Sequence, residues 1–393
     1  MRLLTSLHSS PGRQSLVERV AALSRERFAE RASEYDAASR FPRENYDDLR
    51  DAGLLAMAVP KKYGGLGVDP LTYALCVLEM AKGCSATALT FNMHSTVLTL
   101  IDMMATEDQK RRYFAEVVEE GKLFASITSE PESSFRDKYV MRTAFIPIKG
   151  GYQVKGVKHF CSIGDSADYF FLSGMLEGHT TSKEGILSAV MPRGTPGVQV
   201  ESEWNATGMR GTASHTIRYD SPVSQDDVVG APGALLSVDL SGFALGYAAT
   251  YLGIAEAAFD FIVEYSKGRS SAVGSRPLDE DMLTLKTIGE MGTSIRAARL
   301  MMYDAALAKS EGEGDATMLA VNQAKYLCAE VGADVTERAM RMAGGRGFLK
   351  SMPLERWHRD SLAGPVMPPV NERCMETAGR LLCGLRAATL EFK

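Results

Sequence analysis

The sequence predicts an α+β protein in which a β-rich segment separates two helical parts. Two changes in the spacing of apolar residues along the 393-residue chain carry this prediction. The spacing is helical up to about residue 122, alternates with a period of two from about 123 to 232, and is helical again afterwards. We therefore expect an N-terminal α-helical domain (1–122), a central antiparallel β-barrel or sandwich (123–232) and a C-terminal four-helix bundle (233–393).

The N-terminal domain is expected to be built from helices of different lengths. A capping-box pattern from Ser15 to Glu18 predicts the start of the first helix, and Pro42 predicts the start of a second that ends at Gly53. A glycine-rich turn at 60–67 then precedes two mostly apolar stretches, 71–80 and 86–104. Both stretches are long enough to form buried helices.

The remaining two domains follow from alternation and from helical runs. Residues 152–160, 167–173 and 197–202 alternate or are rich in β-branched and aromatic residues, with turns at 149–151 and 193–197. From about residue 238 four long helical runs follow, with breaks at 269–277, 311–315 and at the glycine turn near 344. These patterns predict strands first and long helices afterwards.

Composition excludes several classes of protein. The net charge is −5 and no basic stripe occurs, so we expect no nucleic-acid partner. No apolar run approaches the roughly 20 residues of a membrane span, and the N-terminus lacks the apolar core of a signal peptide. The six cysteines show neither pairing nor metal-ligand spacing, which indicates reduced thiols in a cytoplasmic protein without a metal. No phosphate-binding or dinucleotide-binding glycine motif follows a strand, so a nicotinamide cofactor is not expected.

Four short motifs and a late loop carry the chemistry-bearing residues. Segment 124–131 has hydroxyls at Ser126, Thr128 and Ser129 before a proline, and segment 158–164 places Phe160 two residues before Ser162. Glycine-containing turns occur at 208–212 and 344–348, and a proline-rich loop at 359–373 interrupts the last helical run. Considered one at a time, the hydroxyls are expected to cap the local backbone, and Phe160 is expected to be a core residue.

In this order the motifs resemble the acyl-CoA dehydrogenase family of flavoproteins, over nearly the whole chain. The matches are the helix pair and YGGLG turn at 41–67, a TEP-like motif at 127–131, the place of the W-I-T triplet at 160–162, the G-M-R-x-[ST] turn at 208–212, and the F-G-G-x-G-F turn at 342–348. The resemblance implies one FAD bound between the β domain and the C-terminal bundle.

The same resemblance assigns residues to the cofactor. Ile127, Thr128 and Ser129 would meet the pyrimidine edge of the flavin, whereas Phe160, Cys161 and Ser162 would lie against the ring, with Ser162 reaching toward N5. Arg269 would contact the pyrophosphate of a neighbouring subunit's FAD, because a guanidinium fork suits phosphate. The other positions assigned to the cofactor, partly across the subunit interface, are Ser271, Arg341, Gly344, Gly345 and Glu372. A homodimer or homotetramer is implied.

The chain departs from the family where the catalytic base is expected. Dehydrogenases of this family use a glutamate in the late loop, or one on the first long C-terminal helix, and these places are Pro368 and Phe243 here. Neither side chain can accept a proton. Asp360 and Glu372 flank the loop at four or more residues from the place of the glutamate, so we expect their side chains to point elsewhere. Segments 132–136, including Phe135, and 271–278 also lack the family pattern.

Three functions therefore stay open. The first is an FAD-dependent oxidoreductase that oxidises an acyl thioester (acyl-CoA or acyl-carrier-protein) or a related small molecule and passes electrons to an acceptor. The second is a monooxygenase or oxidase that takes reduced flavin from a reductase and needs no base. Its relatives resemble this chain at 208–214 and have a histidine where His94 lies, but they carry H-D-P where residues 367–369 are here. The third is a non-catalytic flavin-binding subunit.

His94 is the only catalytic candidate that the sequence offers. One interpretation is a histidine satisfied inside a buried helix. The other places it over the flavin as an acid–base group, since imidazole titrates near neutral pH. His215 and His358 are expected to be surface or turn residues.

Overall fold

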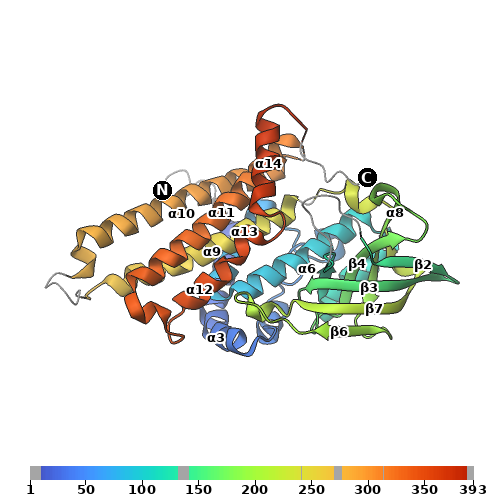
Figure 1. Cartoon of the computed structure of the whole chain (residues 1–393), viewed down its shortest axis with the longest axis horizontal. Helices are drawn as coiled ribbons and strands as arrows, with labels where there is room; N and C mark the ends of the chain where they lie inside the picture. Colours follow the sequence, from blue (N-terminus) through green and yellow to red (C-terminus); the bar gives the residue numbers. More distant parts are fainter. Residues whose placement is uncertain (1–9, 132–140, 240, 270–276, 313, 387–393) are drawn as a thin grey trace.

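The computed structural model describes residues 10–131, 141–239, 241–269, 277–312 and 314–386. Along the long axis of the molecule, a group of nearly parallel helices occupies one end and a β-sheet the other, with α6 (Ser85–Met104) running from the helices toward the sheet (Figure 1). The predicted order of helical, β and helical parts is confirmed.

The N-terminal part is a set of helices whose ends follow from local capping. They are α2 (Pro11–Leu23), a π-helical turn (Ser24–Phe28), α3 (Ala29–Ala38), α4 (Arg43–Asp51), α5 (Pro70–Gly83), α6 and α7 (Glu107–Glu120). The Asp69 side chain caps α5 by accepting from two backbone N–H groups, and Thr106 and Gln109 form a capping box at α7. The start expected at Ser15 is wrong, because α2 begins earlier, with Pro11 in the first turn.

The central part is one mixed sheet. Its strands are β1 (Phe124–Ile127), β2 (Ala144–Ile148), β3 (Gly151–Cys161), β4 (Tyr169–Leu176), β5 (Ile186–Pro192), β6 (Val198–Ser202), β7 (His215–Ser224) and β8 (Val228–Val229). The order is β6-β7-β3-β2-β4-β5-β8, and β1 pairs with β4. Both β1 and β2 run parallel to β4, so the expectation of a purely antiparallel barrel or sandwich is wrong. The hairpin β2–β3 intervenes between β1 and β4, which lets β4 return in the direction of β1.

The C-terminal part consists of three long helices and a broken fourth run. They are α9 (Ser241–Ser266), α10 (Met282–Glu311) and α11 (Asp315–Met342), followed by the turn η7 (Gly344–Phe348), α12 (Leu354–Ser361), α13 (Ala363–Val366) and α14 (Asn371–Leu382). Prolines at 353, 365, 368 and 369 divide the fourth run, so the bundle differs from four long helices. Helix α5 of the N-terminal part packs along α9.

Short elements complete the chain. They are α8 (Ser182–Gly185) and the 3-10 turns η2 (Lys61–Tyr63), η3 (Arg210–Thr212), η4 (Gln225–Asp227), η5 (Ala234–Ser237) and η6 (Leu278–Glu280). All six cysteines are unpaired. Within the part of the chain that the structure describes, no helix combines the length and the apolar character that crossing a membrane requires.

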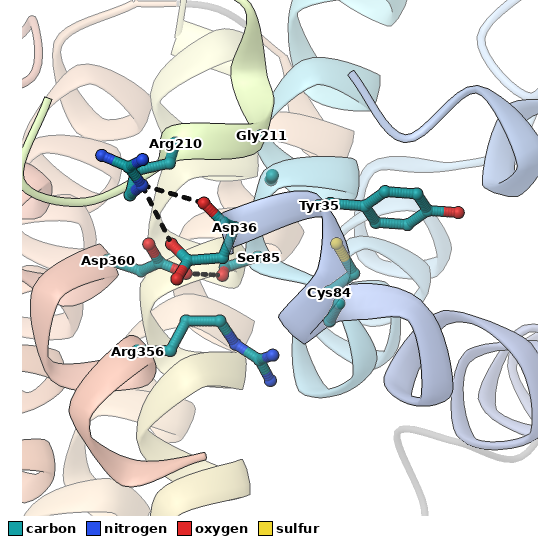
Figure 2. A pocket seen from close by; sticks show the side chains of 10 residues that line it. Tyr35, Asp36, Cys84, Ser85, Arg210, Gly211, Arg356 and Asp360 are labelled. Atoms are coloured by element: carbon teal, nitrogen blue, oxygen red, sulfur yellow. Dashed lines mark hydrogen bonds and ion pairs between the residues drawn. The ribbon is translucent and has the colours of Figure 1, made fainter. Parts of the chain in front are cut away.

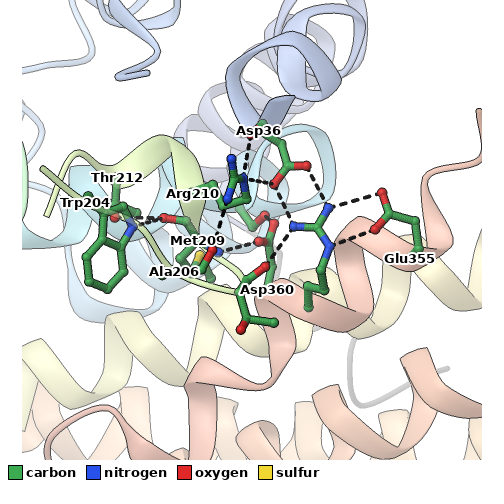
Figure 3. A network of polar contacts seen from close by, with 11 residues as sticks. Asp36, Trp204, Ala206, Met209, Arg210, Thr212, Glu355 and Asp360 are labelled. Atoms are coloured by element: carbon green, nitrogen blue, oxygen red, sulfur yellow. Dashed lines mark hydrogen bonds and ion pairs between the residues drawn. The ribbon is translucent and has the colours of Figure 1, made fainter. Parts of the chain in front are cut away.

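A polar junction joins the three parts of the molecule. The Arg359 guanidinium on α12 donates to both carboxylate oxygens of Asp36 on α3, at 2.9 and 2.6 Å (Figure 3). The buried Asp360 carboxylate accepts from Met209 N–H at 2.6 Å and from the Ser85 hydroxyl of α6. A Cβ at Gly208 would lie 2.0 Å from the Arg359 carbonyl oxygen, so this approach of the sheet turn to α12 requires glycine.

The junction encloses a small cavity lined by Asp36, Ser85, Arg210 and the buried Arg356 (Figure 2). Its volume of about 10 Å³ is close to the minimum that a single water molecule needs. The cavity is therefore too small for a substrate.

Candidate functional site

Backbone strain concentrates in two neighbouring turns of the sheet. Among the described residues, five other than glycine have positive φ, and four of these lie in two short segments: Phe160 (+54°), Ile163 (+64°), Met209 (+51°) and Ala213 (+46°). Such conformations cost about 1–3 kcal/mol each and persist where the surroundings impose them, often at ligand sites. Backbone hydrogen bonds from Ile163 and Gly164 to residues 212 and 213 join the two turns.

Phe160 stands out from the first of these turns. A bulge between Lys158 and Cys161 shifts the register of β3 against β7, and the Phe160 side chain is left 52% exposed. Its ring meets His159 at 4.1 Å and Trp204 at 5.9 Å, both edge-on. The structure therefore corrects the core interpretation of Phe160 alone, because the strained backbone turns its ring outward, where a planar ligand can stack.

Beside Phe160 lies a chain of three buried hydroxyls. Ser162 Oγ is 2.8 Å from Ser214 Oγ, which is 2.7 Å from Thr212 Oγ1. The Thr212 hydroxyl is in turn 2.9 Å from the Met209 carbonyl oxygen. The neighbouring Cys161 is buried, and burial raises the pKa of its thiol to about 12, so it is a neutral thiol. The two turns thus combine an aromatic face with hydrogen-bonding groups.

The end of β1 lies next to these two turns and completes the candidate site. Ile127 is buried, whereas Thr128 and Ser129 are half-buried. The Thr128 carbonyl accepts from Lys158 Nζ at 3.2 Å, and the Ser129 carbonyl accepts from His159 N–H at 2.9 Å. The residues predicted at 127–129 and 160–162 therefore lie side by side.

A buried ion pair holds these segments together. Lys158 Nζ lies 2.8 Å from Glu130 Oε1, and the two side chains are 0% and 3% exposed. Although burial opposes ionisation, the Lys158 charge and the Arg142 N–H lower the pKa of Glu130, so the carboxyl group is charged. Both residues lie within the motifs at 124–131 and 158–164, but no local pattern in the sequence pairs them.

His94 is buried in α6. Its Nδ1 accepts from Phe124 N–H at 3.1 Å, which places the proton of the neutral ring on Nε2. Burial lowers the pKa of His94 to about 4, and the backbone of Leu55 only partly offsets this. His94 therefore stays neutral at pH 7. The Nε2–H group that results is buried and has no hydrogen-bond partner among the described residues, so His94 is buried in the helix but only half satisfied there. Its Nδ1 contact is with the start of β1, whereas the candidate flavin residues follow the end of that strand.

The two positions expected to carry the base hold no carboxylate, and the two acidic residues that flank the late loop are placed elsewhere. Pro368 is exposed, and Phe243 packs edge-on against Tyr247 at 4.4 Å. Asp360 is committed to the polar junction, and Glu372 is exposed in the first turn of α14. None of these four described residues therefore supplies the base of the dehydrogenase reaction.

Lys325 on α11 anchors the loop that carries Pro368. This fully buried side chain on α11 donates to the Gly364 carbonyl at 2.9 Å and to Asn371 Oδ1 at 2.8 Å. Burial lowers the pKa of Lys325 to about 8, against the opposing effect of nearby Cys374, Glu372 and Glu330. The anchor fixes both ends of the segment 364–371.

The residues assigned to a subunit interface lie at the surface of the bundle. Arg269 stacks over Tyr265 at 3.8 Å, Arg341 is exposed beside Glu337, and Gly344 and Gly345 are exposed. Within this chain they lie on other elements than the residues of the sheet site. Ser271, and the segment 132–136 with Phe135, lie outside the described residues.

Two residues of the site region, Trp204 and His215, lie where the sequence patterns did not predict them. Trp204 contacts Phe160, and its indole N–H donates to the Met209 carbonyl at 2.9 Å. His215, expected at the surface, is buried: its Nδ1 accepts from Trp204 N–H at 2.9 Å and its Nε2 lies 3.4 Å from Asp165. The one local signal for the contact between Trp204 and the Met209 turn is that the tryptophan lies a few residues before the G-M-R motif in the sequence.

Comparison with known proteins gives consistent matches along the chain. Residues 10–120 match the "Acyl-CoA dehydrogenase, N-terminal domain", residues 125–221 the middle domain and residues 236–380 the C-terminal domain. A short-chain specific acyl-CoA dehydrogenase of Clostridium acetobutylicum is 30% identical over 335 residues, which cover 84% of this chain and 87% of that protein.

Two further relatives differ in their activity. Dibenzothiophene monooxygenase of Mycolicibacterium goodii is 29% identical over 372 residues, covering 89% of each chain. The solved structure of butyryl-CoA dehydrogenase from Megasphaera elsdenii superposes with a TM-score of 0.88 at 27% identity, covering 95% of this chain and 98% of that one.

We expect Lys158→Met to destabilise the sheet domain by about 3–5 kcal/mol, because Glu130 would keep an uncompensated buried charge. Urea unfolding followed by far-UV circular dichroism measures the change. Lys155→Met is the matched control, since Lys155 lies on the same strand with its side chain 54% exposed. A loss no larger than that of the control would show that the pair does not fix the strands.

The stability of the protein is expected to depend on the charge of Lys325. Its folded-state pKa of about 8 lies below the roughly 10.4 of an unfolded lysine, so folding disfavours the charged form. The free energy of unfolding should therefore gain up to about 3 kcal/mol from this group as pH rises from about 8 to about 10.4. Lys325→Met should abolish this part of the rise, whereas Lys286→Met, on an exposed lysine, should keep it. Equal pH dependence in all three proteins would contradict the assignment.

Proposed function

Because the chain belongs to the acyl-CoA dehydrogenase family, we propose that it is an FAD-dependent oxidoreductase acting on an acyl thioester or a related small molecule. The observation that carries the proposal is the pair of strained turns that expose Phe160 beside the buried Ser162 hydroxyl. A flavin needs such an aromatic wall together with hydrogen-bonding partners along its polar edge.

The residues present fit the cofactor. Phe160 offers a ring to the flavin plane, and Ser162 offers a hydroxyl within the same turn. Thr128 and Ser129 are half-buried at the end of β1, close to the same turn through Lys158 and His159. The bound flavin would supply the capacity to take up two electrons as a hydride. The protein residues position it and keep water from its buried edge.

The substrate side of the proposal rests on the family and on the short-chain specific relative. A dehydrogenase of this type must remove a proton from the carbon next to the thioester carbonyl while hydride leaves the following carbon. Pro368 and Phe243 cannot do so, and positioned general bases contribute ~10²–10⁴-fold to the rate. We therefore expect slow turnover of ordinary straight-chain acyl-CoA.

A second candidate is a monooxygenase that uses reduced flavin supplied by a partner reductase. The absence of a carboxylate at both base positions favours it, since oxygen transfer needs no α-proton base. The 29% identity to a dibenzothiophene monooxygenase over nine-tenths of the chain also supports it. Anaerobic bleaching of bound FAD by acyl-CoA would favour the dehydrogenase, and tighter binding of reduced than of oxidised flavin would favour the monooxygenase.

We further propose a homodimer or homotetramer that completes its flavin sites across subunits. Apolar side chains are exposed at the start of α10 (Met282 and Leu283) and on η7, where Phe348 is 77% exposed. Large exposed apolar groups of this kind are typical of protein contacts. A shallow hollow on the outer face of α10, lined by Gly289, Thr293 and Ala297, would allow close approach of a second chain.

Ser162→Ala is expected to weaken FAD binding or to shift the absorption spectrum of the bound flavin, because the ring loses a hydrogen-bonding partner. Isothermal titration and the visible spectrum measure the two effects. Ser173→Ala is the matched control, since Ser173 forms an equal 2.8 Å hydroxyl pair with Ser188 elsewhere in the sheet. Unchanged affinity and spectrum in the Ser162 variant, with the fold intact, would contradict the cofactor assignment.

Pro368→Glu is expected to raise the rate of acyl-CoA oxidation, because it places a carboxylate where the family carries one. The assay follows anaerobic reduction of bound FAD by butyryl-CoA or octanoyl-CoA. Val366→Glu, at an exposed position in the same loop, controls for the added charge. Wild-type turnover within the typical enzyme range of about 1–10³ s⁻¹ would overturn the argument from the missing base.

Arg269→Ala is expected to lose FAD more readily, because the pyrophosphate of a neighbouring subunit's cofactor would be left without its guanidinium partner. Retention of FAD through gel filtration, combined with light scattering, measures the effect. Lys267→Ala is the control, since Lys267 is exposed and pairs with Glu264 on its own helix. A wild-type monomer that holds FAD would refute the shared site.

A further inference from the structure

Three donors meet at the Met209 carbonyl oxygen in the turn between β6 and β7. The Trp204 indole N–H donates to it at 2.9 Å, the Thr212 backbone N–H at 3.2 Å and the Thr212 hydroxyl at 2.9 Å (Figure 3). A carbonyl oxygen has two lone pairs, and the two N–H donors point in fixed directions whereas a hydroxyl rotates. The Thr212 hydroxyl is therefore the donor that the carbonyl can release.

The released hydroxyl is one end of the chain Ser162–Ser214–Thr212. Each hydroxyl carries one proton, so the chain has two possible polarities. If the Thr212 proton points to Met209, the proton of Ser162 points to Ser214, and Ser162 offers only lone pairs to a ligand. If the Thr212 proton points to Ser214, the order reverses and Ser162 keeps a proton to donate.

We propose that Trp204 is a positioning residue that lets this hydroxyl chain reverse, so that Ser162 can accept a hydrogen bond from the bound flavin or donate one to it. The inference rests on the proposed FAD site and on Ser162 reaching N5. That nitrogen is an acceptor in the oxidised ring and an N–H donor in the two-electron-reduced ring. A protein group that serves both forms needs both polarities.

The surroundings of the chain support this role. Ser162, Ser214 and Thr212 are all at least 95% buried, so water does not compete for their protons. An unsatisfied buried hydroxyl is costly, which makes the three orientations change together. Trp204 itself is held in place, because its backbone N–H donates to His215 Nδ1 at 2.9 Å and its ring packs against Phe160.

Two variants should shift the reduction potential of bound FAD in opposite directions. Trp204→Phe opens one lone pair on the Met209 carbonyl, the Thr212 hydroxyl takes it, and Ser162 is held as an acceptor. Reduced FAD should then gain about tenfold in affinity relative to oxidised FAD, the effect of one hydrogen bond. For a two-electron couple this is a potential about 30 mV more positive.

Thr212→Val removes the far end of the chain while nearly keeping its shape. Ser214 must then donate to Ser162, and Ser162 donates outward to the ring. The affinity for oxidised FAD should rise by a similar factor relative to the affinity for reduced FAD, and the reduction potential should become more negative. Equilibration with a redox dye of known potential, together with the binding constants of oxidised and reduced FAD, measures both shifts.

Trp357→Phe is the control, because Trp357 is the only other tryptophan and packs against Phe261 in the helical bundle. It should leave the potential unchanged. If both variants bind FAD but shift its reduction potential in the same direction, or if Thr212→Val does not shift it, the proposed reversal of the hydroxyl chain is wrong. The assignment of the cofactor site would not be affected by that result. Failure of the wild-type protein to bind FAD would instead overturn the proposed function.

Discussion

The buried ion pair between Lys158 and Glu130 is the interaction on which the site depends. Lys158 also donates to the Thr128 carbonyl, and Glu130 accepts from the N–H groups of Arg142 and Thr143. One pair of charges thereby joins the end of β1, the start of β2 and the part of β3 just before the bulge. Separating either charge from its partner would leave it uncompensated at a buried position, which costs several kcal/mol. The segments that face the ligand are held in one arrangement for this reason.

That rigidity explains how two strained turns persist next to each other. Each positive φ outside glycine costs free energy, and the cost is met only where neighbouring contacts leave no alternative. The first turn is fixed by the ion pair and by its backbone bonds to the second. The second is fixed by Asp360, which accepts from Met209 N–H, and by Trp204, which donates to the Met209 carbonyl. The residues around Phe160 therefore belong to the sheet, but α12 also fixes their positions through Asp360.

Local patterns predicted the elements well and their pairing poorly. The stretch expected to be helical at 86–104 is α6 within one residue, because apolar residues, helix length and the break at Gly83–Cys84 agree. The parallel pairing of β1 with β4 could not be predicted, since it depends on partners 45 residues apart. The resemblance indicated which residues belong to the site, but alternation alone would bury Phe160, and the bulge that exposes it has no local signal. The burial of His215 likewise depends on Trp204, a contact decided by the folded turn.

The polar junction also sets the order in which the protein can be completed during synthesis. Asp36 is separated from its partner Arg359 by 323 residues, and the ribosome adds about 5–20 residues per second. For on the order of ten seconds or more, the nascent chain therefore has the Asp36 carboxylate and the Gly208–Thr212 turn without their contacts to α12. Only the emergence of α12 lets both be satisfied. A chain that stops before α12 would lack the Asp360 contact that holds the second strained turn, so the cofactor site can be completed only after α12 has been synthesised.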